Sequence, residues 1–437
     1  MSNNNKTYHR VSGILNFSGD KSLSHRAAIL SSIAKGSSAI ENFLQAEDTK
    51  NTMLAMESMG VQRTGEFTET FKVDSPGLSG YSQNSANIDV GNSGTGARLL
   101  LGLFSGLPDT SVTIDGDDSL RKRPMGRIAE PLARFGAHFE PSDKLPIQVM
   151  GKKLLPIIHH ETLGSAQVKS ALMLAAIASN VPLRLEESKP SRDHTENMLE
   201  YCGIDILRET LDTGGNIIEM EPPYEVQPRE FNIWGDISSA SFFIILGLLA
   251  KEGEIRVNDV LLNPFRDRFI KILREMGGDL EVIEKETRCG EKGGDIIARP
   301  SKLVGIAIDP KDIPGIIDEL PILTIAGVFA TGEFTFRNAK ELRFKESDRI
   351  AVMVENLKRC GVAVEEFPDG LKVSGDPSRK LTGEVETFMD HRIVMSFEIA
   401  NIISRANGET QDLTIKGREW VSTSFPDFFN KLDQVVF

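Results

Sequence analysis

The sequence is poor in cysteine, in tyrosine and tryptophan, in basic charge and in long apolar runs. Among 437 residues it holds 3 Cys, 4 Tyr and 2 Trp. The cysteines Cys202, Cys289 and Cys360 are scattered and lack CxxC spacing, which excludes a disulfide framework and a thiolate metal site. We expect all three to be small buried side chains, because two of them directly precede a glycine at a predicted helix end.

The low basic content limits the possible partners. A formal net charge of −13 argues against a general nucleic-acid surface, because phosphate contacts require a basic excess. The start, MSNNNKTYHR, lacks a signal-peptide core, and runs such as FFIILGLLA from Phe242 are too short to cross a bilayer. We therefore expect a cytoplasmic, globular protein that binds anions only through a local cationic pocket.

What the sequence does contain is a recurrence of polar segments that run directly into apolar stretches of helical length. They recur about every 70 to 80 residues, as expected for a repeated supersecondary block. Each carries Ser, Asp or Asn where a helix start needs a side-chain oxygen, and helix N-termini attract anions. These six predicted helix starts, called tips below, are GDKSLSHR at Lys21, GNSGTGAR near Asn92, GSAQVKS at Ser165, GDISSAS at Asp236, IDELPIL at Asp318 and MDHRIVM at Asp390.

A second recurrence marks helix ends. Five glycines follow amphipathic helix patterns and precede short alternating apolar runs, which predicts left-handed C-caps at Gly60, Gly136, Gly203, Gly277 and Gly361. The two series together predict six α/β blocks, arranged either as one ring or as two domains of three.

A proline-rich break at residues 221–235 favours two domains. We expect residues 20–233 to form an inserted domain and residues 1–19 and 234–437 to form a discontinuous one. A strand within residues 8–18 would cross back to complete the C-terminal half, and the chain is predicted to end in a helix, FPDFFNKLDQVVF.

The first two tips offer cations for an anion. Lys21, Ser22 and Arg26 fall within the first turns of one helix and resemble a phosphate site, although Asp20 between Gly19 and Lys21 excludes a Walker A loop. For a single tip, a capped and solvated helix start would be the default reading. The glycines of GNSGTGAR allow close backbone approach. The cations that follow are Arg98, Arg121, Lys122, Arg123 and Arg127, with Pro124 expected at a helix N1 position.

The third tip and the segment KPSRDHT offer hydroxyl, amide and cationic donors suited to a polyhydroxylated anion. These donors are Ser165, Gln167, Lys169 and Arg192. His159 and His160 are adjacent on a predicted strand, so they point apart and are interpreted as structural rather than as zinc ligands.

The densest charge pattern is ELRFKESDR followed by MDHR. For a lone segment, a solvated salt-bridge ladder would be the preferred interpretation. Two such segments at equivalent tips, with Asp318 and Glu319 at a third, favour carboxylates whose pKa values are tuned for proton transfer. The residues concerned are Arg343, Lys345, Glu346, Asp348, Arg349, Asp390, His391 and Arg392.

These motifs, in order, resemble the 5-enolpyruvylshikimate-3-phosphate synthase family over nearly the whole chain: GDKS-x-SHR, GNSGT-x-x-R, R-x-RP, SAQ-x-KS, SRDHT, GD-x-SSA, the DE pair, K-E-S/T-DR, DHR and TSFP. The resemblance implies an α/β fold of two inside-out barrels, each with three βαβαββ units, closing on substrates between the domains. It also implies transfer of the carboxyvinyl group of phosphoenolpyruvate to the 5-hydroxyl of shikimate 3-phosphate, on the pathway to chorismate and aromatic amino acids. It implies no cofactor and no metal, and we expect a monomer.

The resemblance also implies site residues. Around shikimate 3-phosphate it places Lys21, Ser22, Arg26, Ser165, Ala166, Gln167, Arg192, Asp318 and Lys345. Around phosphoenolpyruvate it places Lys21, Gly94, Arg123, Gln167, Arg349 and Arg392. It implies Asp318 and Glu346 as acid and base with Lys21 assisting, Asn92 shaping its loop and His391 supporting the hydrogen-bond network.

Two positions depart from the family pattern. Many members carry a lysine six residues before the FP of the last motif, where this chain has Glu419; Lys416 or Arg418 would then supply the charge. The segment Gly96-Ala97-Arg98-Leu99 differs from one branch of the family. In this family an alanine in place of Gly94 crowds the pocket and reduces binding of glyphosate, an analogue of phosphoenolpyruvate. The resemblance therefore implies that this chain is inhibited by glyphosate, competitively with phosphoenolpyruvate.

Two other functions compete with this interpretation. In the related UDP-N-acetylglucosamine enolpyruvyltransferases, the first tip resembles GxKN rather than the GDKS of this chain. Those enzymes usually also carry a reactive cysteine near the arginine-rich segment, where this chain has no cysteine. A non-catalytic anion-binding scaffold would need the cations but not Asp318 and Glu346.

Overall fold

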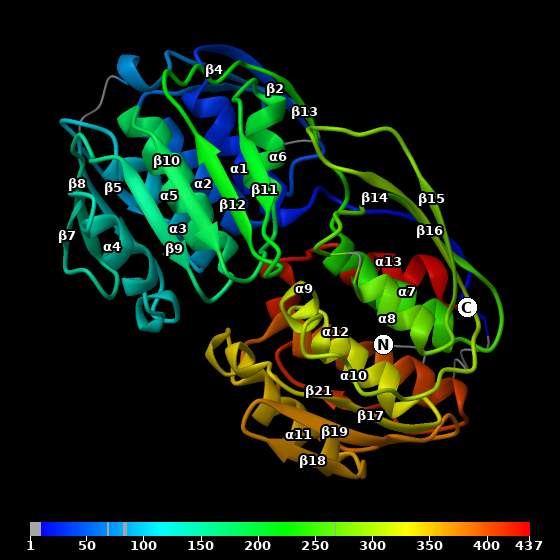
Figure 1. Ribbon diagram of the computed structural model, residues 1–437. Coiled ribbons are helices and arrows are strands. Elements are labelled where there is room, and N and C mark those ends of the chain that lie inside the picture. The colour runs from blue at the N-terminus through cyan, green and yellow to red at the C-terminus, as the bar shows by residue number, and fades with distance from the viewer. Residues whose placement is uncertain (1–9, 68–69, 82–84, 267) are drawn as a thin grey trace. The chain divides into compact units, whose positions relative to one another are not determined.

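The computed structural model describes residues 10–67, 70–81, 85–266 and 268–437. The chain divides into two compact units (Figure 1). Unit 1 contains the N-terminal segment up to Phe17, Gly235–Glu286 and Lys292–Phe437, and unit 2 contains Ser18–Trp234 and Thr287–Glu291. Among the contacts that hold the short segment 287–291 in unit 2, Trp234 Nε1 donates to Glu291 O at 2.9 Å and Cys289 Sγ to Asn232 O at 3.3 Å.

Unit 2 repeats one motif, a parallel strand pair extended by an antiparallel hairpin, in three sheets. Their strand orders are β13-β2-β4-β3, β5-β6-β8-β7 and β9-β10-β12-β11. The helices are α1 (Lys21–Ile33), α2 (Glu47–Glu57), α3 (Gly94–Ser105), α4 (Gly126–Ala133), α5 (Ala166–Ser179) and α6 (His194–Tyr201), with the 3₁₀ turns η1 (Leu78–Gly80) and η2 (Leu120–Lys122). The strands are β2 (Gly36–Glu41), β3 (Gln62–Thr64), β4 (Thr70–Ser75), β5 (Ser85–Asp89), β6 (Ser111–Asp115), β7 (His138–Glu140), β8 (Ile147–Met150), β9 (Ile157–Glu161), β10 (Leu183–Glu187), β11 (Leu207–Thr210), β12 (Asn216–Met220) and β13 (Glu230–Asn232).

Unit 1 repeats the motif less regularly, with strand orders β1-β14-β16-β15, β17-β19-β18 and β20-β21. Its helices are α7 (Ile237–Leu249), α8 (Arg268–Glu275), α9 (Ile313–Ile316), α10 (Leu320–Val328), α11 (Arg349–Arg359), α12 (His391–Ala406) and α13 (Phe428–Val435), with η3 (Lys340–Phe344) and η4 (Arg418–Thr423). Its strands are β1 (Gly13–Asn16), β14 (Ile255–Leu261), β15 (Asp279–Glu284), β16 (Gly293–Arg299), β17 (Gly332–Phe336), β18 (Val364–Phe367), β19 (Gly370–Gly375), β20 (Glu384–Val385) and β21 (Thr414–Ile415).

Two strands explain how the chain alternates between the units. The N-terminal β1 pairs in parallel with β14, which confirms that a strand near the start completes the C-terminal half; residues 8 and 9 of that prediction lie outside the described part. Conversely, β13 pairs in parallel with β2 and supplies the first strand of a sheet in unit 2. The helix predicted at the C-terminus is confirmed as α13.

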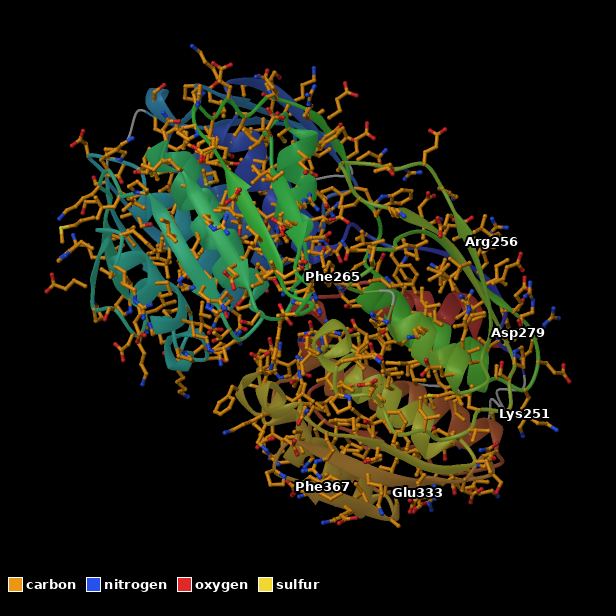
Figure 2. The ribbon with its side chains drawn as sticks, viewed as in Figure 1. Lys251, Arg256, Phe265, Asp279, Glu333 and Phe367 are labelled. Atoms are coloured by element: carbon orange, nitrogen blue, oxygen red, sulfur yellow. The ribbon has the colours of Figure 1, made fainter. Side chains whose placement is uncertain are left out.

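In each unit, apolar helices lie inside and the sheets lie outside. Helices α7, α10 and α12 pack against one another in unit 1 and α3 packs against α5 in unit 2. A Cβ on Gly102 of α3 would lie 2.4 Å from the carbonyl oxygen of Ala171 on α5, so only glycine permits this approach. Strands such as β4 alternate between buried and exposed residues, and charged side chains such as Asp279 and Glu333 project outward from unit 1 (Figure 2). Within the described residues, the sheets do not close into a barrel.

The structure confirms all six predicted helix starts, as α1, α3, α5, α7, α10 and α12. In five of them, the residue before the helix accepts hydrogen bonds from backbone N–H groups in the first turn: Asp20, Ser93, Ser165, Asp236 and Asp390. The exception is α10, where Glu319 makes no cap and Pro321 removes one of the N–H groups that would need one. The five predicted C-cap glycines all have positive φ, between 80° and 100°.

One local prediction is wrong. Pro124 does not start a helix: residues Leu120–Lys122 form the separate turn η2, and α4 begins at Gly126. The backbone between them is held differently, since Met125 N donates to Asp143 O at 2.7 Å. The three cysteines are free and buried, as expected. No helix in the described ranges is long and apolar enough to cross a membrane.

Candidate active site

The start of α1 places Lys21, Ser22 and Arg26 on its first two turns. Lys21 Nζ forms an ion pair with Asp48 on α2, and both Lys21 and Ser22 are partly exposed. Asp20 accepts a hydrogen bond from Leu23 N at 3.0 Å and so fixes where the helix begins.

Arg26 is buried, yet neutral groups hold it. Its Nε donates to Thr195 Oγ1 at 2.7 Å, Nη2 to Ser170 Oγ at 2.8 Å and Nη1 to Ser22 O at 3.0 Å. Burial lowers the pKa of Arg26 to about 10, and the nearby charge of Glu196 opposes that shift. The guanidinium therefore stays cationic at neutral pH while no carboxylate hydrogen-bonds to it in these contacts.

The second tip organises Asn92, Gly94 and Arg123. Arg123 Nη2 donates to Asn92 Oδ1 at 2.6 Å, and Asn92 Nδ2 donates to Asp117 Oδ2 at 2.6 Å. Gly94 is the first residue of α3, and a Cβ there would lie 3.1 Å from Arg98 Nη1 and 3.5 Å from Arg123 Nη1. The glycine keeps the space beside both arginines open.

The third tip is joined to the second through Gln167. Gln167 Oε1 accepts from Arg98 Nη1 at 2.9 Å, and its Nε2 donates to Thr95 Oγ1 at 3.1 Å. Ser165 caps α5, whose first residue is Ala166. Arg98 thus supports both tips, and Ser165, Ala166 and Gln167 remain partly exposed.

The loop before α6 carries Arg192, which is partly exposed. Lys169, expected from sequence to be another donor for the anion, is not available for that role. Its side chain is 1% exposed and is bound to Glu187 and Glu196. The expectation fails because α5 turns this residue into the interior of unit 2.

In unit 1, residues at or just before the starts of α10, α11 and α12 meet at Asp318. Lys345 Nζ donates to Asp318 Oδ1 at 3.3 Å, Arg349 Nη1 lies 3.5 Å from the same oxygen, and Arg392 Nη1 donates to Asp318 O at 2.9 Å. The partly exposed Asp318 carboxylate thus has two cations beside it, Lys345 and Arg349, while Arg392 binds the main-chain oxygen of the same residue.

Arg349 links Asp318 to two further carboxylates. Its Nη2 donates to Glu346 Oε2 at 2.6 Å and its Nε to Asp390 Oδ2 at 2.8 Å. Burial lowers the pKa of Arg349, but the charges of Asp390, Glu346 and Asp318 outweigh it and the net shift is upward. Arg349 is 2% exposed, and its buried Nη1 has no hydrogen-bond partner among the described atoms.

His391 begins α12 beside this cluster and is buried. Burial, opposed by the charges of Asp390 and Glu346, lowers the pKa of His391 to about 3. The imidazole is therefore neutral at physiological pH and can act only as a hydrogen-bonding group.

Sequence reasoning missed two buried groups beside the tips. His25 Nδ1 lies 2.8 Å from Thr52 Oγ1 and its Nε2 3.4 Å from Ser93 Oγ, so it connects α1 to α2 and to the start of α3; burial, together with Lys21 and Arg26, lowers its pKa. In unit 1, Ser238 at the start of α7 donates to Glu319 and accepts from Arg266. The only sequence signals for these groups were the position of His25 inside the first motif and that of Ser238 inside GDISSAS.

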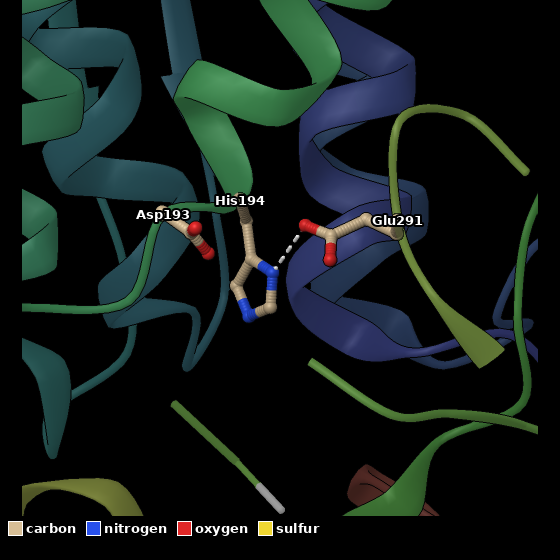
Figure 3. A group of neighbouring side chains, drawn as sticks. All are labelled: Asp193, His194 and Glu291. Carbon is tan, nitrogen blue, oxygen red and sulfur yellow. Dashed lines mark hydrogen bonds and ion pairs between the residues drawn. The ribbon is translucent and has the colours of Figure 1, made fainter. Parts of the chain in front are cut away.

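Asp193, His194 and Glu291 form a group in unit 2 whose possible metal-ligand atoms lie within 4.8 Å of one another (Figure 3). His194 Nδ1 already lies 2.7 Å from Glu291 Oε1, and Asp193 lies 3.7 Å from Arg208 Nη1. His194 Nδ1 is thus already paired, while its buried Nε2 has no hydrogen-bond partner among the described atoms, and the group ties the segment 287–291 to α6.

Glu419, which stands where many members of the family carry a lysine, lies on η4 and is exposed. Both cations expected to replace the lysine are already paired with carboxylates. Lys416 is paired with Glu384 and Glu386, and Arg418 Nε lies 2.7 Å from Glu398 Oε1.

The comparisons with known proteins agree over the full length. The family description EPSP synthase (3-phosphoshikimate 1-carboxyvinyltransferase) matches residues 6–432. A 3-phosphoshikimate 1-carboxyvinyltransferase of Leptospira biflexa is 43% identical, covering 95% of this chain and 96% of its own, and one from Sulfurihydrogenibium sp. is 40% identical over 98% of each chain.

Solved structures give the same result. An EPSP synthase from Acinetobacter baumannii aligns with TM-score 0.86 and 35% identity over 98% of this chain and 96% of that one. The enolpyruvyl transferase NikO from Streptomyces tendae, at 17% identity and TM-score 0.70, covers 98% of this chain and 97% of that one and shares the fold. The architecture is therefore that of the enolpyruvyl transferases, a two-domain inside-out α/β fold. Within that class, the chain belongs to the EPSP synthase (3-phosphoshikimate 1-carboxyvinyltransferase) family.

Proposed function

We propose that this protein transfers the carboxyvinyl group of phosphoenolpyruvate to the 5-hydroxyl of shikimate 3-phosphate and releases phosphate. Full-length similarity to enzymes of that name supports the reaction. The observation that carries the chemistry is the convergence of Asp318 and Glu346 on the cations Lys345, Arg349 and Arg392 at three helix starts of unit 1.

Shikimate 3-phosphate carries a phosphate, a carboxylate and hydroxyl groups on one ring. Unit 2 offers hydrogen-bond donors for each of these groups. Arg26 and Arg192 neutralise charge, and Ser22, Ser165 and Gln167 donate or accept hydrogen bonds, with the N–H groups at the start of α5 beside Ala166. Lys21 contacts both substrates once it leaves Asp48, and Asp318 and Lys345 of unit 1 complete this set.

Phosphoenolpyruvate carries a phosphate and a carboxylate on three carbons, so it needs closely spaced cations. In unit 2, Arg123 and Gln167 lie beside the space left by Gly94, with Asn92 holding Arg123. In unit 1, Arg349 and Arg392 supply two further guanidinium groups, which suit phosphate and carboxylate by their planar donor geometry.

The reaction requires proton transfers to the methylene carbon of phosphoenolpyruvate, from the 5-hydroxyl, and from the methyl group of the intermediate. Glu346 protonates the methylene carbon of phosphoenolpyruvate, which makes C2 electrophilic, while Asp318 accepts the proton of the 5-hydroxyl as its oxygen attacks C2. Breakdown of the tetrahedral intermediate expels phosphate, which takes up the proton held by Asp318, and a methyl proton returns to Glu346. Lys21 assists proton transfer, and neutral His391 supports the hydrogen bonds of the carboxylate cluster.

We also propose that units 1 and 2 correspond to the two domains expected from the sequence, that the enzyme acts as a cytoplasmic monomer, and that it needs no metal. Size-exclusion chromatography with light scattering tests the monomer. Activity retained in EDTA tests the metal requirement.

The reaction is tested by phosphate release with both substrates and with each omitted, together with mass spectrometry of the product. We expect release only when both are present, and a product heavier than shikimate 3-phosphate by one carboxyvinyl group. Release that proceeds with UDP-N-acetylglucosamine instead would identify the other enolpyruvyl transferase activity. No release with either acceptor would support a binding scaffold.

A further inference from the structure

A buried ion cluster lies directly beneath the residues proposed to bind shikimate 3-phosphate. Lys169 Nζ on α5 lies 2.7 Å from Glu196 Oε1 and 3.0 Å from Glu187 Oε2. The three side chains are 1%, 2% and 0% exposed, respectively. Lys169 lies one helical turn after Ser165, so the cluster underlies the third tip.

The cluster fixes the loop between β10 and α6. Lys169 Nζ donates to Ser191 O at 3.2 Å, and Ser191 Oγ donates to Glu187 Oε1. Ser191 is therefore held through both its main chain and its side chain. The next residue is Arg192, whose direction depends on where Ser191 lies.

The cluster also fixes the residues that orient Arg26. Glu196 is the third residue of α6, and its neighbour Thr195 accepts from Arg26 Nε at 2.7 Å. Ser170, the residue after Lys169, accepts from Arg26 Nη2 at 2.8 Å and lies 2.6 Å from Thr195 Oγ1. Each hydroxyl that holds Arg26 is adjacent in sequence to a charged member of the cluster.

We propose that Lys169 is a positioning residue for shikimate 3-phosphate: its ammonium, bound between Glu187 and Glu196, holds the 191–196 segment so that Arg192 and Arg26 face the substrate. This inference rests on the proposed function. Lys169 itself does not touch the substrate.

The physical argument is that a buried ion cluster is a poor way to gain stability. Desolvating the charges offsets most of their attraction, and apolar replacements are frequently as stable or more stable. Such a cluster does impose direction, because each hydrogen bond has a fixed donor and acceptor. With Arg26 included, two positive and two negative side chains balance, and Arg192 directly follows Ser191, which the same cluster holds.

The test compares Lys169→Met with wild type in the phosphate-release assay and in calorimetric binding of shikimate 3-phosphate. We expect KM and Kd for shikimate 3-phosphate to rise about tenfold or more, and KM for phosphoenolpyruvate to change by less than about threefold. Leu174→Ala, at a buried apolar position later on α5, controls for lost stability and should leave both KM values unchanged. Ser191→Ala is the milder second variant, with a rise of about threefold expected.

The double variant Lys169→Met/Glu196→Gln separates positioning from charge balance. It restores a neutral set with Arg26 and Glu187 but not the hydrogen bonds to the loop, so the elevated KM should persist. Recovery of the wild-type KM in the double variant, or an unchanged KM in both Lys169→Met and Ser191→Ala, would overturn the inference. A wild type that releases no phosphate would instead overturn the proposed function, whatever Lys169 does.

Discussion

The two units each bring several helix starts together, but they hold their central arginines differently. In unit 2, Arg26 is bound by the hydroxyls of Thr195 and Ser170. The neighbouring carboxylates of Glu187 and Glu196 are paired with Lys169 instead. In unit 1, Arg349 is bound by the carboxylates of Glu346 and Asp390.

This difference separates two uses of the same residue type. A guanidinium held by neutral oxygens keeps its charge for an incoming anion. One held by carboxylates instead fixes the direction of those carboxylates through its hydrogen bonds. The repeated fold therefore provides a binding surface in one unit and a proton-transfer cluster in the other, although both units begin their helices in the same way.

The largest expected effect comes from the carboxylates of unit 1. Asp318→Asn and Glu346→Gln keep the size of each side chain but remove its proton-transfer capacity, so kcat should fall roughly 10²- to 10⁴-fold. Calorimetric binding of shikimate 3-phosphate should weaken far less. Glu355→Gln, an exposed position on α11 paired with Arg359, is the matched control and should retain wild-type kcat. Equal losses in kcat and in affinity would mean that the two units do not divide binding from chemistry.

Arg26 tests the other half of the comparison. Arg26→Gln removes a buried charge proposed to meet the substrate, so KM for shikimate 3-phosphate should rise roughly 10- to 100-fold, the cost expected for charged hydrogen bonds. The change in kcat should be smaller than for Asp318→Asn. The exposed Arg134→Gln, after α4, is the control for lost positive charge. A kcat loss without a KM change would place Arg26 with the catalytic groups instead.

Gly94 tests how closely unit 2 fits phosphoenolpyruvate. In Gly94→Ala the new Cβ meets Arg98 Nη1 at 3.1 Å, so these groups must shift and the space beside Arg123 narrows. We expect wild-type inhibition by glyphosate to be competitive with phosphoenolpyruvate, and the inhibition constant of the variant to rise about tenfold. At Gly126 an added Cβ meets only the flexible end of Glu130, so Gly126→Ala should leave inhibition unchanged. Noncompetitive inhibition of the wild type would contradict the role given to Gly94.

Local sequence signals were enough for the six predicted helix starts and for the five helix ends that carry a C-cap glycine. Asp20, Ser93 and Asp390 are recognisable as caps because a cap bonds to N–H groups only two or three residues away. Gly203 and the other C-cap glycines are recognisable for the same reason. The helix start predicted at Pro124 was wrong because the backbone after it is held by Asp143, which is distant in sequence.

Groups whose role depends on contacts distant in sequence could not be assigned from local patterns. Lys169 reads as an exposed donor in GSAQVKS, and only packing of α5 against Glu187 and Glu196 buries it. His25 lies between the predicted anion-binding residues of the first motif, but its contacts are with Thr52 and Ser93, which are distant in sequence. The resemblance supplied candidate roles for Asp318 and Glu346, while their meeting at Arg349 comes from the fold.

The smallest effect concerns a feature that the two units share, a buried neutral histidine beside a helix start. Burial lowers the pKa of His391 to about 3, so between pH 6.5 and 3 the unfolded chain binds a proton there that the folded chain does not. Folding stability is therefore lost as the pH falls through this window, by about 1.4 kcal/mol between pH 7.5 and pH 5.5. His391→Gln removes this contribution. Urea unfolding at pH 7.5 and 5.5 should show a smaller loss of stability in the variant than in wild type, whereas Met395→Leu, buried on the same helix, should keep the wild-type difference. If His391→Gln loses as much stability as wild type over this range, the imidazole is protonated in the folded protein and takes part in the charge balance of unit 1.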